Sequence, residues 1–521
     1  MSALVLSTLN ARYAHTSLGL RYLFANLDDD LRAQTKIVEF VIGSKTETLV
    51  EQLLAQSPKV IGFGVYIWNV EETTKLVAML KAVAPEIKIV IGGPEVSFET
   101  KEQRIVSLAD HVVTGQGDVT FNKLARALLH GPRPLMKVHV GEEFELDDLT
   151  LPYEHYSDED IARRHLYVEA SRGCPFKCEF CLSALDQTAL PFDTQRFLAE
   201  MAKLYDRGAR TFKFVDRTFN LNVKTSQAIL EFFLERIEAK PDDPCFAHFE
   251  LVPDHLPDKL KDTIAKFPAG TLQFEIGIQT WNPTVQGHIS RKQNNDKARD
   301  NIRWLHANSH AHMHVDLIAG LPGESLASFG EGFDKLVRLG PHEIQVGVLK
   351  RLRGTPIIRH TDAFAMRYNP EPPYNILSNS DLTFGDVQRL NRFARFWDLI
   401  GNSGRFAATL PLILQQAPVS AFDRFMALAD WLYAETGATH QIALERRFDL
   451  VYRWLQAEGA IAPDAAQQAV LADYVKSGSK GRLSFMTRGL TVADDGRTGL
   501  RAATPARQRR HLTQAAEIQR A

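Results

Sequence analysis

Cys174, Cys178 and Cys181 stand within eight residues of one another. Thiolates are soft ligands that suit iron–sulfur clusters and zinc. Zinc-binding cysteines commonly come as Cys-x-x-Cys pairs, whereas these three have the spacing Cys-x-x-x-Cys-x-x-Cys after an expected strand. With no fourth cysteine nearby, the three thiolates would bind three irons of a [4Fe–4S] cluster and leave the fourth iron open. The spacing therefore favours an open cluster over a three-cysteine zinc site or three ordinary buried cysteines.

The same segment resembles the motif of the radical S-adenosylmethionine (SAM) superfamily, which has this spacing and an aromatic residue before the last cysteine, here Phe180. The resemblance covers about residues 165–355. It implies a partial (β/α)6 barrel of TIM type, in which SAM chelates the open iron. It also implies that an electron from the cluster cleaves SAM to a 5′-deoxyadenosyl radical, which abstracts a hydrogen atom from the substrate.

Short apolar segments alternate with amphipathic ones in this part of the chain. The expected barrel strands are residues 166–170, 211–215, 245–250, 272–279, 312–318 and 343–349. Alternate residues of a strand share a face, so Glu275, Gly277 and Gln279 face one way, as do His314 and Asp316 on the next strand. Because ordinary TIM barrels fill their interior with Val, Ile and Leu, an ionisable face predicts either a lumen for cofactor and substrate or a structural polar network.

The resemblance also implies positions that bind SAM. Ile318-Ala-Gly320-Leu-Pro-Gly-Glu324 is similar to the adenine-contacting motif of the family, and Glu275-Ile-Gly-Ile-Gln279 resembles its fourth-strand pattern. Arg291 lies where an arginine commonly pairs with the SAM carboxylate. The usual Gly-Gly-Glu of the second strand is absent, and Asp216 stands there instead, where it would accept the SAM ammonium. For both Asp216 and Arg291, the alternative is a solvated salt bridge. The implied SAM set is Asp216, Glu275, Gln279, Arg291, Ile318 and Gly320.

The first 135 residues show a βαβ rhythm, which predicts a doubly wound domain with a parallel sheet. The expected strands are residues 3–7, 36–41, 60–67, 88–91 and 110–113, and the expected helices are 18–27, 46–56, 70–83 and 120–129. Ligands of such sheets bind at the carboxyl ends of the strands. Three of these ends carry glycines or large aromatic residues, namely Tyr66 and Trp68, Gly92 and Gly93, and Gly115 and Gly117.

A doubly wound domain ahead of the barrel resembles the cobalamin-binding domain of cobalamin-dependent radical SAM enzymes, in a subgroup whose reactions are mostly unassigned. This implies cobalamin beside Gly92, Gly93, Gly115 and Gly117; a vestigial fold that serves as substrate platform is the alternative. The fingerprint Asp-x-His-x-x-Gly is missing, because His15 stands as His-x-x-x-Gly. We therefore expect cobalamin without a histidine lower ligand. Tyr66 and Trp68 either flank the corrin or pack a domain interface.

Composition excludes several other classes of protein. The chain has 521 residues, 61 Lys and Arg, and 63 Asp and Glu, so bulk charge predicts no polyanion binder and no clear nucleic-acid signature. No apolar run approaches ~18 residues and the start lacks a secretory signal, so no membrane association is expected. Four cysteines are too few for a disulfide scaffold and favour a reducing cytoplasm. Only Cys245 lies outside the triplet, so no second cluster is expected.

We predict an α/β protein with five segments: a cobalamin-binding-like, Rossmann-type doubly wound domain (1–135), a linker (136–163), the radical SAM partial barrel (164–360), a helical C-terminal domain (361–500) and a basic, weakly ordered tail (501–521). The leading hypothesis is cobalamin-dependent methyl transfer to an unactivated carbon. The alternatives are cobalamin-free radical SAM oxidation or rearrangement, and a non-catalytic cluster-bearing RNA-binding or scaffold protein. The resemblance implies an electron donor such as flavodoxin or ferredoxin, and the substrate is not predicted.

Overall fold

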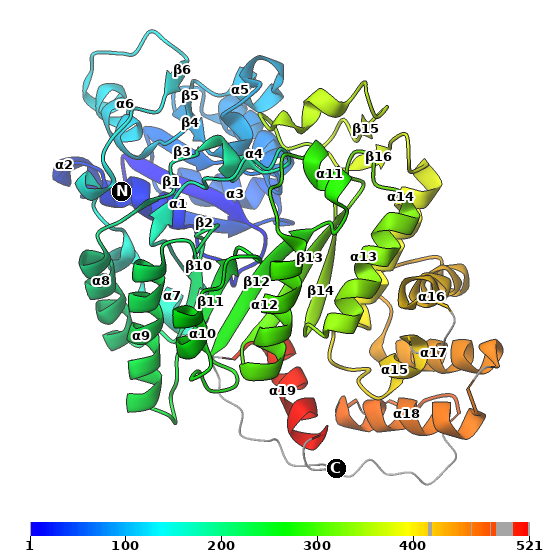
Figure 1. Cartoon of the computed structure of the whole chain (residues 1–521). Helices are drawn as coiled ribbons and strands as arrows, with labels where there is room; N and C mark the ends of the chain where they lie inside the picture. The colour runs from blue at the N-terminus through cyan, green and yellow to red at the C-terminus, as the bar shows by residue number, and fades with distance from the viewer. Residues whose placement is uncertain (1, 415–418, 460, 480, 486–503, 519–521) are drawn as a thin grey trace. The chain divides into compact units, whose positions relative to one another are not determined.

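The computed structural model describes residues 2–414, 419–459, 461–479, 481–485 and 504–518, with side chains omitted for residues 513–518 (Figure 1). The chain divides into two compact units, which are described separately. Unit 1 comprises residues 1–219, 350–358 and 369–375. Unit 2 comprises residues 220–349, 359–368 and 376–521.

Unit 1 begins with a six-stranded sheet in the order β2-β1-β3-β4-β5-β6. Its strands are β1 (Leu4–Asn10), β2 (Thr35–Val41), β3 (Val60–Gly64), β4 (Lys88–Gly92), β5 (His111–Thr114) and β6 (Val138–Val140). All neighbours pair in parallel, and Leu4 of β1 is in register with Thr35 of β2 and Val60 of β3. β2 lies on one side of β1 and β3 lies on the other, so the direction of the strand order reverses at β1. Doubly wound sheets bind their ligands at such a reversal, at the carboxyl ends of the strands.

Helices cover both faces of this sheet. They are α1 (Leu18–Ala25), α2 (Asp29–Arg32), α3 (Thr46–Leu54), α4 (Val70–Val83), α5 (Arg104–Leu108) and α6 (Asp118–His130). One apolar cluster joins the strands to Leu53 of α3, Leu76 of α4 and Ile105 of α5. A second cluster joins them to α1 and to Phe121 of α6. Because both faces are covered, β1 is buried along its whole length, and the predicted doubly wound domain is confirmed.

The rest of unit 1 leads into and beyond the cysteine triplet. It contains α7 (Asp158–Arg163), β7 (Leu166–Val168), β8 (Ser171–Arg172), β9 (Leu190–Pro191), α8 (Thr194–Asp206) and β10 (Thr211–Phe214). β7 pairs in parallel with β10, and β8 pairs antiparallel with β9. Both β6 and α7 lie within residues 136–163, which the sequence analysis expected to be a linker. β6 was missed because none of its three residues is buried, so it leaves no apolar segment in the sequence.

Unit 2 continues the alternation of strands and helices. Its strands are β11 (Phe246–Leu251), β12 (Leu272–Gln279), β13 (His312–Ala319) and β14 (Glu343–Val348). The helices between and before them are α9 (Val223–Ala239), α10 (Asp258–Ile264), α11 (Pro283–His288), α12 (Asn295–Asn308) and α13 (Leu326–Leu339). β11 to β14 pair in parallel. The second six-stranded sheet has the order β14-β13-β12-β11-β10-β7, which follows the chain as in the predicted (β/α)6 region.

The C-terminal part of unit 2 is mainly helical, as predicted. It contains a short pair of strands, β15 (Arg367–Tyr368) and β16 (Ile376–Ser378), followed by α14 (Phe384–Leu399), α15 (Thr409–Leu414), α16 (Ala421–Thr436), α17 (Leu444–Glu458), α18 (Pro463–Lys476) and α19 (Ala506–Ile518). Aromatic side chains join these helices to the barrel region. Phe333 of α13 lies 4.7 Å from Trp397 of α14 and 6.0 Å from Phe422 of α16, measured between ring centroids.

Helix α19 lies within the segment that was expected to be a weakly ordered basic tail. This expectation is wrong for residues 504–518, because Thr504 and Gln508 are buried. Arg507 donates from Nη1 to Glu343 (2.7 Å) and from Nη2 to Asp398 (2.8 Å). The arginines that suggested a solvated tail therefore include a partner of a buried carboxylate. Among the described residues, every helix is too short or too polar to cross a bilayer.

Candidate functional site

The cysteine loop follows β8 in unit 1. Cys174 and Cys178 are buried, and Cys181 is half-buried; none of the three forms a disulfide. The loop is closed by hydrogen bonds from the Cys174 amide to the Asp186 carbonyl (2.7 Å) and from the Cys181 amide to the Cys178 carbonyl (3.1 Å). Burial raises the pKa of the Cys174 thiol, and the charges of Cys181 and Cys178 raise it further. The three sulfur atoms therefore lie within electrostatic reach of one another.

The cysteine loop carries the three predicted ligands of an open [4Fe–4S] cluster. Among the described residues, no three His, Cys, Asp or Glu side chains are close enough to share one ion. A [4Fe–4S] cluster does not require that closeness, since each thiolate binds a different iron. The remaining cysteine, Cys245, is buried in unit 2. The zinc alternative gains no support, and the assignment of Cys174, Cys178 and Cys181 to a cluster stays a prediction.

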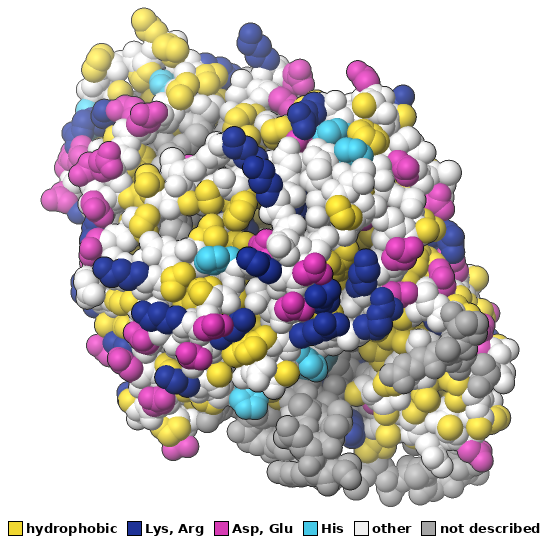
Figure 2. Space-filling model, in the orientation of Figure 1, with side chains coloured by type: hydrophobic (Ala, Val, Ile, Leu, Met, Phe, Trp, Pro, Cys, Tyr) yellow, Lys and Arg dark blue, Asp and Glu magenta, His cyan; other side chains and the backbone are white. Residues whose placement is uncertain are grey.

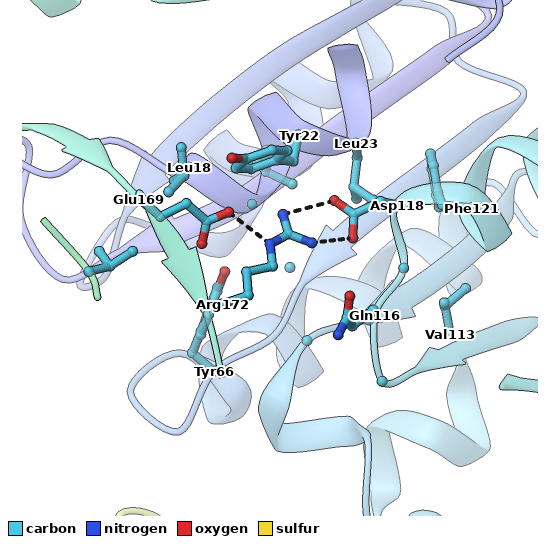
Figure 3. Close-up of a pocket in the computed structure, with 18 of the residues that line it drawn as sticks. Leu18, Tyr22, Leu23, Tyr66, Val113, Gln116, Asp118, Phe121, Glu169 and Arg172 are labelled. Atoms are coloured by element: carbon cyan, nitrogen blue, oxygen red, sulfur yellow. Dashed lines mark hydrogen bonds and ion pairs between the residues drawn. The ribbon is translucent and has the colours of Figure 1, made fainter. Parts of the chain in front are cut away.

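A cavity of about 410 Å³ lies in unit 1 at the carboxyl ends of β3, β4 and β5 (Figure 3). The four glycines predicted to bind cobalamin all line it: Gly92, Gly93, Gly115 and Gly117. Gly93 has a φ of +111°, and a Cβ atom there would lie 2.6 Å from the Val65 carbonyl oxygen. Only glycine fits that position without a shift of the backbone. The four glycines come from two loops of the sequence and together line one side of the cavity, which we call the glycine wall. A wall without side chains leaves space for a large flat ligand.

Charged groups hold the segment that follows Gly93. Glu95 accepts hydrogen bonds from Arg353 Nε (3.0 Å) and from the Tyr374 hydroxyl (2.7 Å). Arg353 also donates from Nη1 to Glu99 (2.7 Å). Burial raises the pKa of Glu95, although the hydrogen bonds from Tyr374 and Arg353 oppose this. Arg353 and Tyr374 therefore hold the segment that directly follows Gly93 through charged hydrogen bonds.

The aromatic and histidine residues singled out in the sequence separate into two places. Tyr66 lines the cavity and stacks on Trp68, with ring centroids 4.4 Å apart and an angle of 8° between the rings. Trp68 itself is exposed. His15 does not line the cavity; its Nδ1 lies 2.6 Å from the Tyr167 hydroxyl. This placement agrees with the expectation that His15 is not a lower ligand of cobalamin.

The sequence analysis missed an ionic group in the cavity wall. Arg172 donates from Nε to Glu169 (2.8 Å) and from Nη1 and Nη2 to the two oxygens of Asp118 (3.1 and 3.2 Å) (Figure 3). Its Cζ lies 4.4 Å from the ring centroid of Tyr22. Burial raises the pKa of Glu169, and Arg172 opposes the rise. The position of Arg172, directly before Gly173 and Cys174, is a signal that could have identified it.

Asp216 lies buried in unit 1, where it holds the segment between β7 and β8. Its carboxylate accepts hydrogen bonds from the Ala170 amide (3.0 and 3.2 Å to the two oxygens) and from the Ser171 hydroxyl (2.6 Å). Burial raises its pKa from 3.8 to about 7, although the hydrogen bonds from Ser171 and Ala170 act in the opposite direction. Asp216 therefore has a structural role, because it fixes the chain at Ala170 and Ser171. Its further role as acceptor of the SAM ammonium stays a prediction.

The predicted polar face is present on β11, β12 and β13 of unit 2. Burial alternates along β12, with Glu275, Gly277 and Gln279 on its less buried side. His248 Nε2 lies 3.3 Å from Glu275 Oε2. Arg291 donates from Nη2 to the Gly277 carbonyl, and a Cβ atom at position 277 would collide with the Gln279 amide. Gln279 and Arg291 therefore both approach Gly277, and their binding of SAM stays a prediction.

A further carboxyl of this face, Asp316 on β13, was left out of the predicted SAM set. Burial raises its pKa well above the usual range; Glu275 and Glu250 raise it further, and Arg291 opposes them. Burial also lowers the pKa of His314. The face thus brings several carboxyl groups together, and both burial and the neighbouring carboxylates disfavour the charged form of Asp316.

Gly320 follows β13 in the left-handed region, with a φ of +90°. A Cβ atom there would lie 2.6 Å from Ile376 Cγ2, and its carbonyl accepts a hydrogen bond from the Asn379 side chain (3.3 Å). The atoms that approach Gly320 in this structure therefore belong to the chain itself. Ile318 is half-buried on the same strand. Contacts of Gly320 and Ile318 with SAM stay predictions.

Family comparisons agree with this arrangement. The family described as B12 binding domain matches residues 5–125, and the Radical SAM superfamily matches residues 168–336. A third family, described only as a protein of unknown function (DUF4080), matches residues 362–519. The chain therefore contains a match to the B12-binding domain ahead of a match to the radical SAM domain. Its two matched domains imply a [4Fe–4S] cluster, SAM and cobalamin as cofactors.

Among individual proteins, the chain is 27% identical over 233 residues to an uncharacterized methyltransferase, PH0819, of Pyrococcus horikoshii, covering 40% of this chain and 50% of that protein. It is 25% identical over 364 residues to the cobalamin-dependent radical SAM methyltransferase TokK of Streptomyces tokunonensis, covering 62% of this chain and 51% of TokK. The chain thus spans about half the length of these curated relatives.

Solved structures show the same fold at low identity. OxsB, a cobalamin-dependent SAM radical enzyme solved with aqua-cobalamin and SAM, is 13% identical with a TM-score of 0.60, covering 91% of this chain and 84% of OxsB. TsrM from Kitasatospora setae, solved with cobalamin and a [4Fe–4S] cluster, is 16% identical with a TM-score of 0.57, covering 72% of this chain and 82% of TsrM.

Proposed function

We propose that this chain is a cobalamin-dependent radical SAM enzyme that transfers a methyl group to an unactivated carbon of its substrate. The observation that carries the proposal is the composition of the cavity wall in unit 1. The wall contains the glycine loops after β4 and β5, and it also contains Gly173, Ser183 and Asp186, which belong to the cysteine loop. A corrinoid in this cavity would therefore lie against the segment that holds the cluster.

In this proposal, Cys174, Cys178 and Cys181 hold the cluster, and Gly92, Gly93, Gly115 and Gly117 leave backbone space for cobalamin. When bound, the cofactors supply an electron for reductive cleavage of SAM and a transferable methyl group. The residues proposed to bind SAM are Asp216, Glu275, Gln279, Arg291, Ile318 and Gly320. Of these, the paired Gln279 and Arg291 offer amide and guanidinium groups that suit a carboxylate.

An electron donor is part of this proposal, because radical SAM chemistry consumes an electron that the chain does not generate. A low-potential carrier such as flavodoxin or ferredoxin would supply it. We also propose a reducing, cytoplasmic compartment, since the chain has only four cysteines and none of them forms a disulfide. The RNA-binding alternative gains no support from the face in Figure 2, where Lys and Arg over α12 and α13 are interspersed with Asp and Glu. Arg299, for example, pairs with Asp296 at 2.7 Å.

The test is anaerobic reconstitution of the full chain with iron, sulfide and hydroxocobalamin, followed by assay of 5′-deoxyadenosine released from SAM. We expect about four irons per chain, a base-off corrinoid spectrum and SAM cleavage by the reduced protein. Cys178→Ala should abolish cleavage, whereas the matched control Cys245→Ala should retain it. SAM cleavage by Cys178→Ala at the parent rate would refute the cluster assignment, and a failure to bind any corrinoid would refute the cobalamin part.

A further inference from the structure

The side chain of Arg172 connects two parts of unit 1 that the proposed function assigns to different cofactors. Its partner Asp118 is the first residue of α6 and directly follows Gly117 of the cavity wall. Arg172 itself ends β8 and stands two residues before Cys174. One guanidinium therefore links the glycine loop after β5 to the segment that begins the cysteine loop, through a bidentate ion pair.

The strength of this link depends on what fills the cavity. Arg172 and Asp118 both line the cavity, and their side chains keep 15% and 9% of their surface exposed. Water in the cavity therefore screens the pair. A ligand that displaces this water lowers the effective dielectric constant, and the Coulomb attraction grows in inverse proportion. The bidentate geometry and the second carboxylate, Glu169, limit the cost of that desolvation.

We infer that Arg172 is a positioning residue that couples the two cofactor sites, so that a corrinoid in the cavity and a cluster on the cysteine loop each raise the affinity for the other. This inference rests on the proposed function. A filled cavity strengthens the Arg172–Asp118 pair and thereby orders the residues between Glu169 and Cys174. Coupling between two binding sites is reciprocal and usually amounts to about 5–150-fold in affinity. Because one side chain carries it here, we expect about 10-fold.

Unit 1 offers a matched control with the same chemistry in another place. Arg21 also pairs with two carboxylates, Glu39 (3.0 Å) and Asp160 (2.8 Å). Its Cζ lies 4.7 Å from the ring centroid of a tyrosine, Tyr156. Arg21 does not line the cavity. Loss of Arg21 therefore disturbs a buried ionic group of the same kind without touching the proposed link.

The experiment measures the dissociation constant of hydroxocobalamin by absorbance, under anaerobic conditions, for the full chain without and with a reconstituted cluster. The variants are Arg172→Gln, Asp118→Asn and the control Arg21→Gln, each checked for folding by circular dichroism. In the parent and in Arg21→Gln, we expect the cluster to tighten hydroxocobalamin binding about 10-fold. In Arg172→Gln and Asp118→Asn, we expect a change below about 2-fold. Hydroxocobalamin should also slow the loss of the cluster to a chelator in the parent and in Arg21→Gln, but not in Arg172→Gln or Asp118→Asn.

The possible failures are distinguishable. Equal affinities in the parent with and without the cluster would overturn the coupling while leaving the proposed cofactors intact. Full coupling in Asp118→Asn and Arg172→Gln would overturn the role of Arg172. If one of the two variants does not fold, the other carries the test, because each removes the same ion pair from a different side. Absence of hydroxocobalamin binding in both forms of the parent would refute the proposed function itself, and the inference with it.

Discussion

Replacement of Glu343 by glutamine should release helix α19 from the strands of unit 2. Glu343 is the first residue of β14, and 7% of its side chain is exposed. It lies 3.0 Å from His312 Nε2 and 2.7 Å from Arg507 Nη1. Burial by itself raises the pKa of Glu343, but the hydrogen bond from His312 and the charges of His314 and Arg507 lower it from 4.5 to about 2. The folded state therefore stabilises the charged carboxylate.

The size of the effect on α19 follows from the one contact of Glu343 that belongs to this helix, the hydrogen bond from Arg507. A hydrogen bond to a charged group contributes about 1.5–3 kcal/mol. Solvent screens part of this, because 34% of the Arg507 side chain is exposed. We therefore expect Glu343→Gln to weaken the docking of α19 by about 2 kcal/mol, which corresponds to about 30-fold more frequent local opening.

Hydrogen–deuterium exchange of the α19 amides measures this opening directly. At pH 7.5, exchange in Glu343→Gln should be about 30-fold faster than in the parent, while exchange in β12 and β13 changes little. Glu458→Gln is the control, since Glu458 pairs with another arginine of unit 2, Arg424, at 2.5 Å. Exchange of α19 within about 3-fold of the parent rate would refute the argument that Glu343 holds this helix.

Four further predictions follow from single observations. Burial lowers the pKa of His342 to about 3 and that of His511 to about 4, so these groups take up protons only when α19 is released, and its protection should fall as the pH falls from about 6.5 to 4. Gly93→Ala should weaken hydroxocobalamin binding at least ~10-fold, because its Cβ atom would collide with the backbone of Val65 and shift the loop that lines the cavity. His15→Ala should leave the corrinoid absorbance spectrum unchanged, since His15 does not line the cavity. Arg291→Ala should keep the cluster but cleave SAM ~100-fold more slowly, as expected for a misplaced substrate.

Each of these has a control or a contrary outcome. A rise in α19 protection on acidification, after correction for intrinsic exchange rates, would contradict the first. Gly43→Ala is the control for Gly93→Ala, because Gly43 also has a positive φ but has no atom within 4 Å of its Cβ position. A changed corrinoid spectrum in His15→Ala would show that His15 reaches the metal. Arg303→Ala, at an exposed position of α12, is the control for Arg291→Ala, and equal rates in both would remove Arg291 from the SAM set.

Local sequence patterns determined much of this protein. The βα rhythm predicted every strand of the second six-stranded sheet and five of the six in the first, because burial on one or both faces of a strand leaves a period in the chain. The spacing of the three cysteines predicted an iron–sulfur loop, because ligands on one short loop are close whatever the rest of the fold does. The missing Asp-x-His-x-x-Gly pattern predicts that His15 is not a lower ligand, and this stays a prediction.

Only the tertiary structure decided which charges meet. Arg172 and Asp118 are 54 residues apart, and Arg507 and Glu343 are 164 residues apart, so no local pattern links them. A basic residue has the same local signature whether it is solvated or paired with a buried carboxylate, and this is why the segment around Arg507 was taken for a weakly ordered tail. Burial makes the difference, since a charge removed from water needs a partner, and the fold alone determines which residues lose their water.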